Sequence, residues 1–211
     1  MASLADRFQR ATHEHLLGRL RPDLDVVVRQ VGKARWRVAA EELMRDAFDR
    51  ERVDNSAVYS RDERSRIRGF DGALGQGLEH WVLLQRGKEI VGAYRGRQEQ
   101  RGSYYMVYSQ IRGDHQGQGL YSALLGKVLA TAKAAGFVEV ASRHHADNNA
   151  ILVAKMKRGF VISGFEIVPR YGLLVTLRSF MSDTVRELHR YRVDATVNGA
   201  ALRRRRLIRD G

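Results

Sequence analysis

The chain contains no cysteine, only two prolines and no long apolar run. Without cysteine, neither disulfide bonds nor thiolate metal ligands can stabilise the protein, which is consistent with a reducing compartment. No stretch approaches the roughly 18 consecutive apolar residues that a membrane-spanning helix needs. The first residues, MASLADRFQRATHEHLL, carry charges throughout and lack the apolar segment of a secretory signal. We therefore expect a cytoplasmic protein that does not enter a membrane.

Charge of one sign is in excess, because the formal net charge is +13. An excess of that size attracts anions such as nucleic acids, acidic proteins and phosphorylated ligands. The surplus is nearly all arginine spread along the chain, and no recognisable nucleic-acid-reading motif accompanies it. Nucleic acid is therefore a candidate partner on charge alone, and a solvated arginine-rich surface explains the same composition.

The order of apolar and polar residues predicts one α+β domain with a mixed, mostly antiparallel sheet flanked by helices. We expect an N-terminal helical extension over residues 1–24, the main domain over residues 25–178, and a basic helical tail with a frayed end over residues 179–211. Runs of β-branched and aromatic residues predict strands over residues 25–30, 80–85, 89–97, 103–111, 137–142, 160–168 and 172–178. Helical patterns cover residues 35–52, 60–70, 119–135 and 148–157.

One segment, Ile111 to Ser122, has the features of a phosphate-binding loop. A strand leads into a loop with Gly117 and Gly119, and the loop opens a helix. Glycines let backbone N–H groups converge on an anion, and the helix N-terminus adds unpaired donors and partial positive charge. A dinucleotide-binding loop needs a third glycine, and a Walker loop needs Gly-Lys-Ser/Thr where this chain has Leu120.

This loop resembles that of the GNAT superfamily, whose signature is Q/R-x-x-G-x-G/A. Gln116 and Gly119 match the signature, whereas Tyr121 stands where the family usually has glycine or alanine. The segment from Asn148 to an apolar helix and Gly159-Phe160 also looks like the family's N…K-x-G-F pattern. The resemblance implies a GNAT-like sheet that splays apart at the cofactor site, with acetyl-CoA as co-substrate.

By the same resemblance, specific residues should hold the cofactor. Backbone groups of Ser109, Gln110 and Ile111 should pair with the pantetheine arm, as an added strand would. Asn148 should lie near the thiol end. The loop and the first turn of its helix should bind the pyrophosphate, which implies roles for Gln116, Gly117, Gln118, Gly119, Leu120, Tyr121 and Ser122.

The catalytic groups are less well defined, because Lys155 occupies the position where the family often has a tyrosine that protonates the leaving thiolate. We expect Lys155 to be solvated, although a lysine with a lowered pKa could donate a proton. Tyr108 beside the splay and His144 or His145 at a strand end are the candidates for proton transfer, and each is also explained by packing or surface exposure. Glu139 should face solvent. No set of ligands with metal spacing is found.

These observations predict an N-acetyltransferase that moves an acetyl group from acetyl-CoA to a primary amine by direct attack in a ternary complex. No cysteine is present to form an acyl-enzyme. The acceptor stays open between a small-molecule amine and a peptide amine, and a second copy of the chain is a candidate partner. The alternatives are a catalytically silent acyl-CoA-binding module and an RNA-associated protein that uses its arginine-rich surface.

Overall fold

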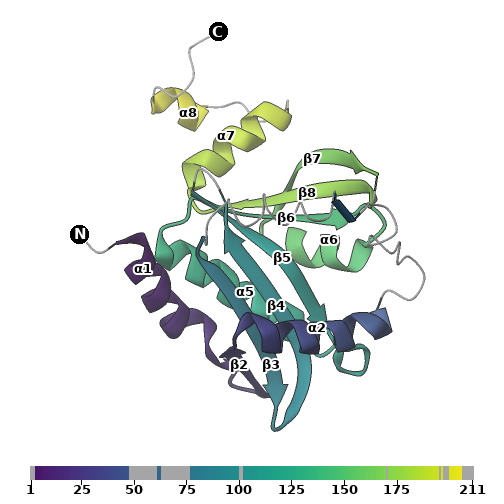
Figure 1. The fold of residues 1–211 in the computed structure, drawn as a ribbon. Helices are drawn as coiled ribbons and strands as arrows, with labels where there is room; N and C mark the ends of the chain where they lie inside the picture. Colours follow the sequence, from purple (N-terminus) through teal and green to yellow (C-terminus); the bar gives the residue numbers. More distant parts are fainter. Residues whose placement is uncertain are drawn as a thin grey trace.

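The computed structural model describes residues 3–47, 61–62, 77–99, 102–169, 171–194, 196 and 200–205. The described residues form an eight-stranded sheet in the order β1-β2-β3-β4-β5-β6-β8-β7 (Figure 1). All neighbouring strands are antiparallel except β5 and β6. The strands are β1 (Gly18–Arg21), β2 (Leu24–Gln30), β3 (Glu79–Arg86), β4 (Glu89–Gln98), β5 (Ser103–Ile111), β6 (Glu139–His145), β7 (Val161–Val168) and β8 (Gly172–Phe180). The predicted α+β class and its mostly antiparallel sheet are confirmed.

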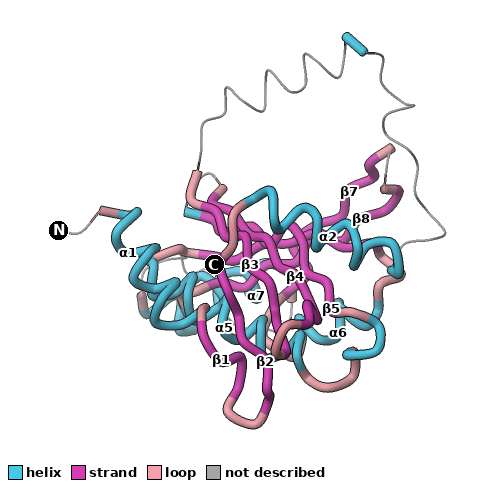
Figure 2. The backbone as a smooth tube through the Cα atoms, turned by 60° about the horizontal axis from the view of Figure 1, so that its bottom comes forward, coloured by secondary structure: helices cyan, strands magenta, loops and turns pink. Residues whose placement is uncertain are grey.

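Helices cover both faces of the sheet. One face carries α5 (Leu120–Ala135) and α6 (Asn149–Met156), and the N-terminal α1 (Leu4–Ala11) with its π-helical continuation η1 (Thr12–Leu16) runs beside α5 (Figure 1 and Figure 2). The other face carries α2 (Lys33–Ala47), which packs on β3, β4 and β5. The helix predicted over residues 60–70 lies outside the described residues, apart from Arg61 and Asp62.

Each face has its own apolar core. The larger core joins α1, α5 and the sheet through buried residues such as Leu16, Leu84 and Leu124. The smaller core lies under α2, where Trp36 is 7% exposed and donates its indole N–H to the backbone oxygen of Tyr94 at 2.9 Å. Side chains of a strand alternate between faces, so central strands buried on both faces read as nearly continuous apolar runs.

The N-terminal segment is integrated into the larger core. A capping box between Ser3 and Asp6 begins α1, and Phe8 is buried against the sheet. The expected extension is not helical throughout, because Gly18–Arg21 forms β1 and pairs with β2. An alternating pattern is too short over four residues to distinguish such a strand from a loop.

A buried chain of hydroxyls and one imidazole ties this segment to the sheet. The hydroxyl of Thr12 lies 2.7 Å from Nε2 of His80, and Nδ1 of His80 lies 2.6 Å from the hydroxyl of Tyr104. The Tyr94 hydroxyl donates to that of Tyr104 at 3.0 Å. Burial lowers the pKa of His80 to about 3, so the ring is neutral near neutral pH.

The C-terminal tail forms α7 (Asp183–Val193) and α8 (Ala200–Arg204). Leu202 in α8 is fully buried. The expectation of a polar, frayed end is therefore wrong for α8, because an apolar side chain on this short helix is removed from water.

Candidate cofactor and catalytic site

The parallel pair β5 and β6 opens into a fork. The two strands pair only at Ser103–Glu139, Tyr104–Val140 and Tyr105–Ala141. Beyond these pairs β5 continues along β4 as far as Ile111, and β6 continues along β8 as far as His145 (Figure 1). Beyond these three pairs β5 and β6 no longer pair with each other, so their facing backbone edges lack each other as partners. We call the space between β5 beyond Tyr105 and β6 beyond Ala141 the fork.

A bulge in β5 sets which side chains line the fork. Met106 and Tyr108 pair with adjacent residues of β4, so Val107 has no partner on that strand. One extra residue reverses the alternation of the strand from that point. Met106 accordingly packs in the core with α5, whereas Tyr108 packs edge-on against Trp36 of α2 with ring centroids 5.3 Å apart. At the fork, β5 therefore places one of these side chains on each face of the sheet.

The loop after β5 ends in an uncapped helix N-terminus. Gly117 and Gly119 have φ angles of +74° and +77°, a region that strains residues with a β-carbon. Gly119 is the N-cap of α5 and has no side chain to cap it. The N–H groups of the first helical turn, from Leu120 to Ser122, therefore lack a capping side chain and carry the positive end of the helix dipole. This cradle fits a diphosphate group.

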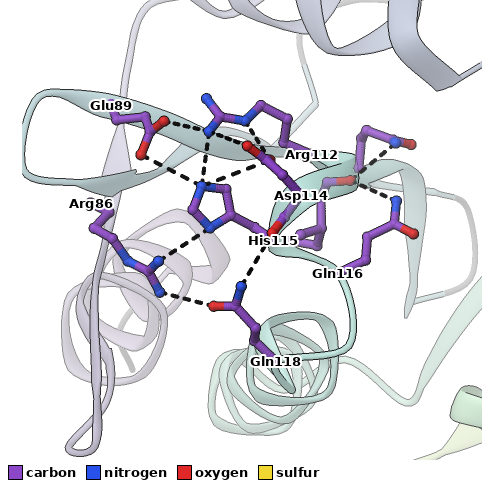
Figure 3. Close-up of polar contacts among 9 residues, drawn as sticks. Arg86, Glu89, Arg112, Asp114, His115, Gln116 and Gln118 are labelled. Atoms are coloured by element: carbon purple, nitrogen blue, oxygen red, sulfur yellow. Dashed lines mark hydrogen bonds and ion pairs between the residues drawn. The ribbon is translucent and has the colours of Figure 1, made fainter.

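A network of charged side chains anchors this loop to the turn between β3 and β4 (Figure 3). Arg112 donates to Glu89, and to Asp114 at 2.7 and 2.8 Å. His115, 8% exposed, lies between arginines, with Nδ1 3.2 Å from Arg86 and Nε2 2.9 Å from Arg112. The hydrogen bonds to Arg112 lower the pKa values of both carboxyl groups. Since these charges are paired with each other, attraction for an anion at the loop rests mainly on its backbone N–H groups.

Glutamine side chains add further hydrogen bonds that hold the loop after β5 in place. The Gln118 side chain accepts from Arg86 at 3.1 Å, and the Gln116 side chain donates to the Ile111 carbonyl at 3.0 Å. Gln110 donates to the same carbonyl at 3.2 Å. Gln116, the first residue of the family signature, thus shapes the loop through its side chain. The Ile111 carbonyl already accepts these two hydrogen bonds within the protein. Pairing of the Ser109–Ile111 backbone with a pantetheine arm stays a prediction.

Asn148 caps α6 at the open end of the fork. Its side-chain oxygen accepts from the N–H of Ile151 at 3.3 Å. Asparagine is among the best N-cap residues, so this capping role accounts for the residue type without a ligand. Its predicted contact with the thiol end of the cofactor stays a prediction.

Lys155 corrects the sequence analysis, because its side chain is fully buried rather than solvated. Its Nζ donates to the hydroxyl of Ser142 at 2.7 Å and lies 3.3 Å from the sulfur of Met106. The amine also lies 4.9 Å from the centre of the Phe160 ring. Burial lowers the pKa of Lys155 to about 7. Helical periodicity could not reveal this, because the residues that bury Lys155 come from other elements.

The other catalytic candidates lie on different faces of the fork. His144 in β6 has Nε2 3.1 Å from the Ser142 hydroxyl, and burial lowers its pKa to about 3. The Tyr108 hydroxyl is buried on the α2 face without a hydrogen-bond partner among the described residues, and burial raises its pKa. Glu139, expected on the solvent side, is half-buried and forms an ion pair with Arg178. Sequence reasoning missed Ser142, since a serine within a strand carries no functional signal.

Metal ligands and membrane spans are both absent from the described residues. No group of three or more histidine, aspartate or glutamate side chains gathers there as metal ligands would. None of the described helices is both long and apolar enough to span a membrane.

The comparisons with known proteins agree with this geometry. No curated protein sequence matches the chain. The ribosomal-protein-S18-alanine N-acetyltransferase from Escherichia coli is structurally similar, with a TM-score of 0.55, 14% identity, and coverage of 74% of this chain and 94% of that chain. A spermidine N-acetyltransferase chimera from Vibrio cholerae gives a TM-score of 0.55 at 14% identity, covering 75% and 96%. An acetyltransferase from Salmonella typhimurium, solved with acetyl-CoA, gives 0.52 at 15% identity, covering 76% and 96%.

At these identities the solved structures show a shared fold. The sequence model of the acetyltransferase (GNAT) family matches residues 38–160, which is more than half of the chain and includes β3, β4, the fork, the glycine loop and α6. The chain therefore belongs to the GNAT family of acetyl-CoA-dependent acyltransferases.

Proposed function

We propose that the protein is an N-acetyltransferase that moves the acetyl group of acetyl-CoA to a primary amine by direct attack in a ternary complex. The observation that carries this proposal is the fork with the uncapped N-terminus of α5 at its open end. Bound there, acetyl-CoA supplies an acyl group activated as a thioester. The chain has no cysteine to accept that group first, which favours direct attack by the acceptor amine.

The residues divide into those that hold the cosubstrate and those that move protons. Backbone N–H groups from Gly117 to Ser122 would bind the diphosphate, and the β5 edge at Ser109 and Gln110 would pair with the pantetheine amides. Tyr108 and His144 lie on different faces of the sheet at the fork, and they stay our candidates for groups near the reacting atoms. A buried and therefore weakly solvated environment strengthens any hydrogen bond made there.

The acceptor class is a primary amine on a small molecule or a peptide. One structural neighbour is a ribosomal-protein-S18-alanine N-acetyltransferase and another is a spermidine N-acetyltransferase chimera, so the fold serves both kinds of acceptor. Loops and helices around a common scaffold decide such specificity, so a panel of amines identifies the acceptor of this chain.

Isothermal titration with acetyl-CoA, followed by thiol release over an amine panel, tests the proposal. The panel should include spermidine, free amino acids and peptides with different N-termini. We expect saturable cofactor binding and thiol release that requires one class of amine. Binding without release by any amine would favour a catalytically silent acyl-CoA-binding module, and absence of binding would contradict the assigned site.

A further inference from the structure

The amine of Lys155 sits in an environment that is costly for a charge. It is fully buried, and its contacts are a hydroxyl, a thioether and an aromatic ring. No carboxylate among the described residues pairs with it. An unpaired buried ammonium is strongly disfavoured, and an apolar side chain of similar length would fill the same space without that cost. Filling the core is therefore an insufficient explanation for a lysine here.

The amine also lies at the apex of the fork. Its two hydrogen-bond partners are Met106 of β5 and Ser142 of β6, and each is one residue beyond the last pair that joins these strands, Tyr105–Ala141. Lys155 thus reaches from α6 into the point where the strands separate. A thiol group that reaches this point between the strands would meet the amine of Lys155, the one ionisable group of α6.

Ser142 links Lys155 to a second titratable group. Nζ of Lys155 donates to the Ser142 hydroxyl at 2.7 Å, so the hydroxyl proton is free to point at Nε2 of His144, 3.1 Å away. The hydrogen-bond pattern then assigns the neutral tautomer of His144 with its proton on Nδ1. Burial lowers the pKa of Lys155 to about 7, and burial together with the charges of Lys155 and His145 lowers that of His144 to about 3. At rest near neutral pH His144 is therefore neutral, and Lys155 is the member of this chain whose resting charge changes with pH; a protonated His144 would exist only in passing during turnover.

We propose that Lys155, Ser142 and His144 form a proton path, in which the ammonium of Lys155 protonates the departing thiol group and is recharged through Ser142 from His144. The inference rests on the proposed function. Acetyl transfer forms a C–N bond and breaks a C–S bond, so one proton must reach the sulfur and one must leave the acceptor nitrogen. Lys155 supplies the first proton. The second enters the path at His144, directly or through water, and the Ser142 hydroxyl relays a proton to Lys155, so no net proton is gained or lost.

In this path Lys155 is the catalytic residue and Ser142 is a positioning residue. The arrangement also separates the two proton transfers in space, since the amine lies at the apex of the fork and His144 lies farther along β6, toward its end. A proton donor with a pKa near the working pH is the most effective general acid, which a solvated lysine would not be.

A binding experiment tests the contact without relying on turnover. The protein is labelled with carbon-13 lysine, and the Lys155 signal is assigned by its loss in Lys155→Met. We expect this signal to titrate near pH 7, and CoA to shift its titration more than desulfo-CoA, which lacks the sulfur atom. Ser142→Ala should change the titration as well. Equal shifts with CoA and desulfo-CoA, or a titration near the ordinary value of 10.5, would overturn the proposal.

Kinetics then test the role. Lys155→Met should lower kcat by about 10²-fold or more while the KM for acetyl-CoA stays unchanged, because the lost interaction is made in the transition state. Wild-type kcat should decline as pH rises above 7, and this limb should disappear in Lys155→Met. Ser142→Ala and His144→Gln should give smaller losses and shift the limb, whereas Lys157→Met, which changes an exposed lysine two residues away, should behave as wild type.

The outcomes separate the inference from the function on which it rests. If wild-type protein acetylates an amine and Lys155→Met retains its kcat and pH profile, the proton path is wrong and the function stands. If no amine is acetylated, the function fails, and the path fails with it unless the carbon-13 titration still distinguishes CoA from desulfo-CoA. Should Lys155→Met not fold, the titration of wild-type protein with the two ligands decides alone, with the signal assigned in Lys155→Arg.

Discussion

The guanidinium of Arg21 lies against Gly119, 3.6 Å from the point that a β-carbon on this glycine would occupy. Arg21 ends β1, far away in sequence from the N-terminus of α5 that Gly119 caps. Its own partner is Asp23, which it contacts at 2.5 and 2.6 Å. The N-terminal hairpin therefore brings a positive charge to the predicted diphosphate site, where the arginine of the loop itself, Arg112, is paired with carboxylates.

Arg21→Gln should weaken acetyl-CoA binding severalfold and reduce its dependence on salt, because an exposed charge beside an anion acts through screened electrostatics. Asp23→Asn should have the opposite effect, since it frees Arg21 from its partner. Arg19→Gln, a change of an exposed arginine on the same strand, serves as the control. Titration calorimetry at two salt concentrations measures all three, and equal affinity for wild type and Arg21→Gln would remove Arg21 from the site.

Gly119→Asp should weaken acetyl-CoA binding by about 100-fold, which corresponds to about 3 kcal/mol. A carboxylate would repel the diphosphate, and the φ of +77° adds strain. Gly119→Asn matches the size without the charge and should lose less affinity. Gly172→Asp, at a φ of +63° with no atom within 4 Å of its β-carbon, controls for backbone strain and should bind as wild type. Undiminished binding by folded Gly119→Asp would place the cofactor elsewhere.

Tyr108→Phe should retain or raise the melting temperature, because the hydroxyl is buried without a partner among the described residues and its ring contact with Trp36 persists. We expect kcat to change far less than in Lys155→Met, since the two groups lie on opposite faces of the sheet. Differential scanning calorimetry and thiol release provide the measurements. A loss of about 10²-fold in kcat would assign the proton donor to Tyr108 and contradict the lysine path.

Deleting residues 199–211 should destabilise the protein by roughly 2–5 kcal/mol, the range for removal of a buried leucine side chain. The sequence predicts a frayed end here, which could be removed without effect, but Leu202 is fully buried. Leu202→Ala should reproduce most of the loss, and Arg204→Ala, which changes an exposed residue of the same helix, should not. Urea unfolding monitors each variant. Equal stability of the truncated and full-length proteins would show that α8 adds nothing to the fold.

The free energy of unfolding should rise between about pH 7 and pH 9 by roughly 1 kcal/mol per pH unit. The folded pKa of Lys155 is about 7 and the ordinary value is 10.5, so in this window the unfolded chain binds the extra proton. Raising the pH therefore stabilises the folded state. Lys155→Met should lack the increase, and a parallel rise in wild type and variant would show that Lys155 is not its source. The window stops below the ordinary pKa of tyrosine, because burial raises the pKa of Tyr94 and reverses the slope.

The loop could be located from the sequence because its signals are local. Glycines at positive φ and the start of a helix follow one another directly along the chain, and the short-range order predicts the strand before them. Lys155 was misjudged because the groups that bury it come from β5, β6 and the segment after α6. Arg21 carried no signal at all, since its approach to Gly119 depends on how the N-terminal hairpin packs.

The bulge at Val107 in β5 could not be predicted from the sequence for a related reason. Val107 is a good strand former, and no glycine or proline near it marks an interruption. Simple alternation would place Tyr108 on the same face as Met106, whereas the structure places these side chains in different cores. Register is a property of the pairing with β4, which the sequence of β5 alone does not contain.

Val107, which has no partner on β4, allows β5 to place neighbouring side chains on both faces of the sheet. Upstream of Val107 the strand contributes Met106 to the side where Lys155 lies, and downstream it contributes Tyr108 to the side under α2. Removing Val107 would move every later side chain of β5 to the other face of the sheet. The glycine loop would then follow a strand whose side chains alternate in the opposite order. Val107 lies outside both the proposed cofactor loop and the helix that carries Lys155, yet it sets how the loop is oriented relative to Lys155.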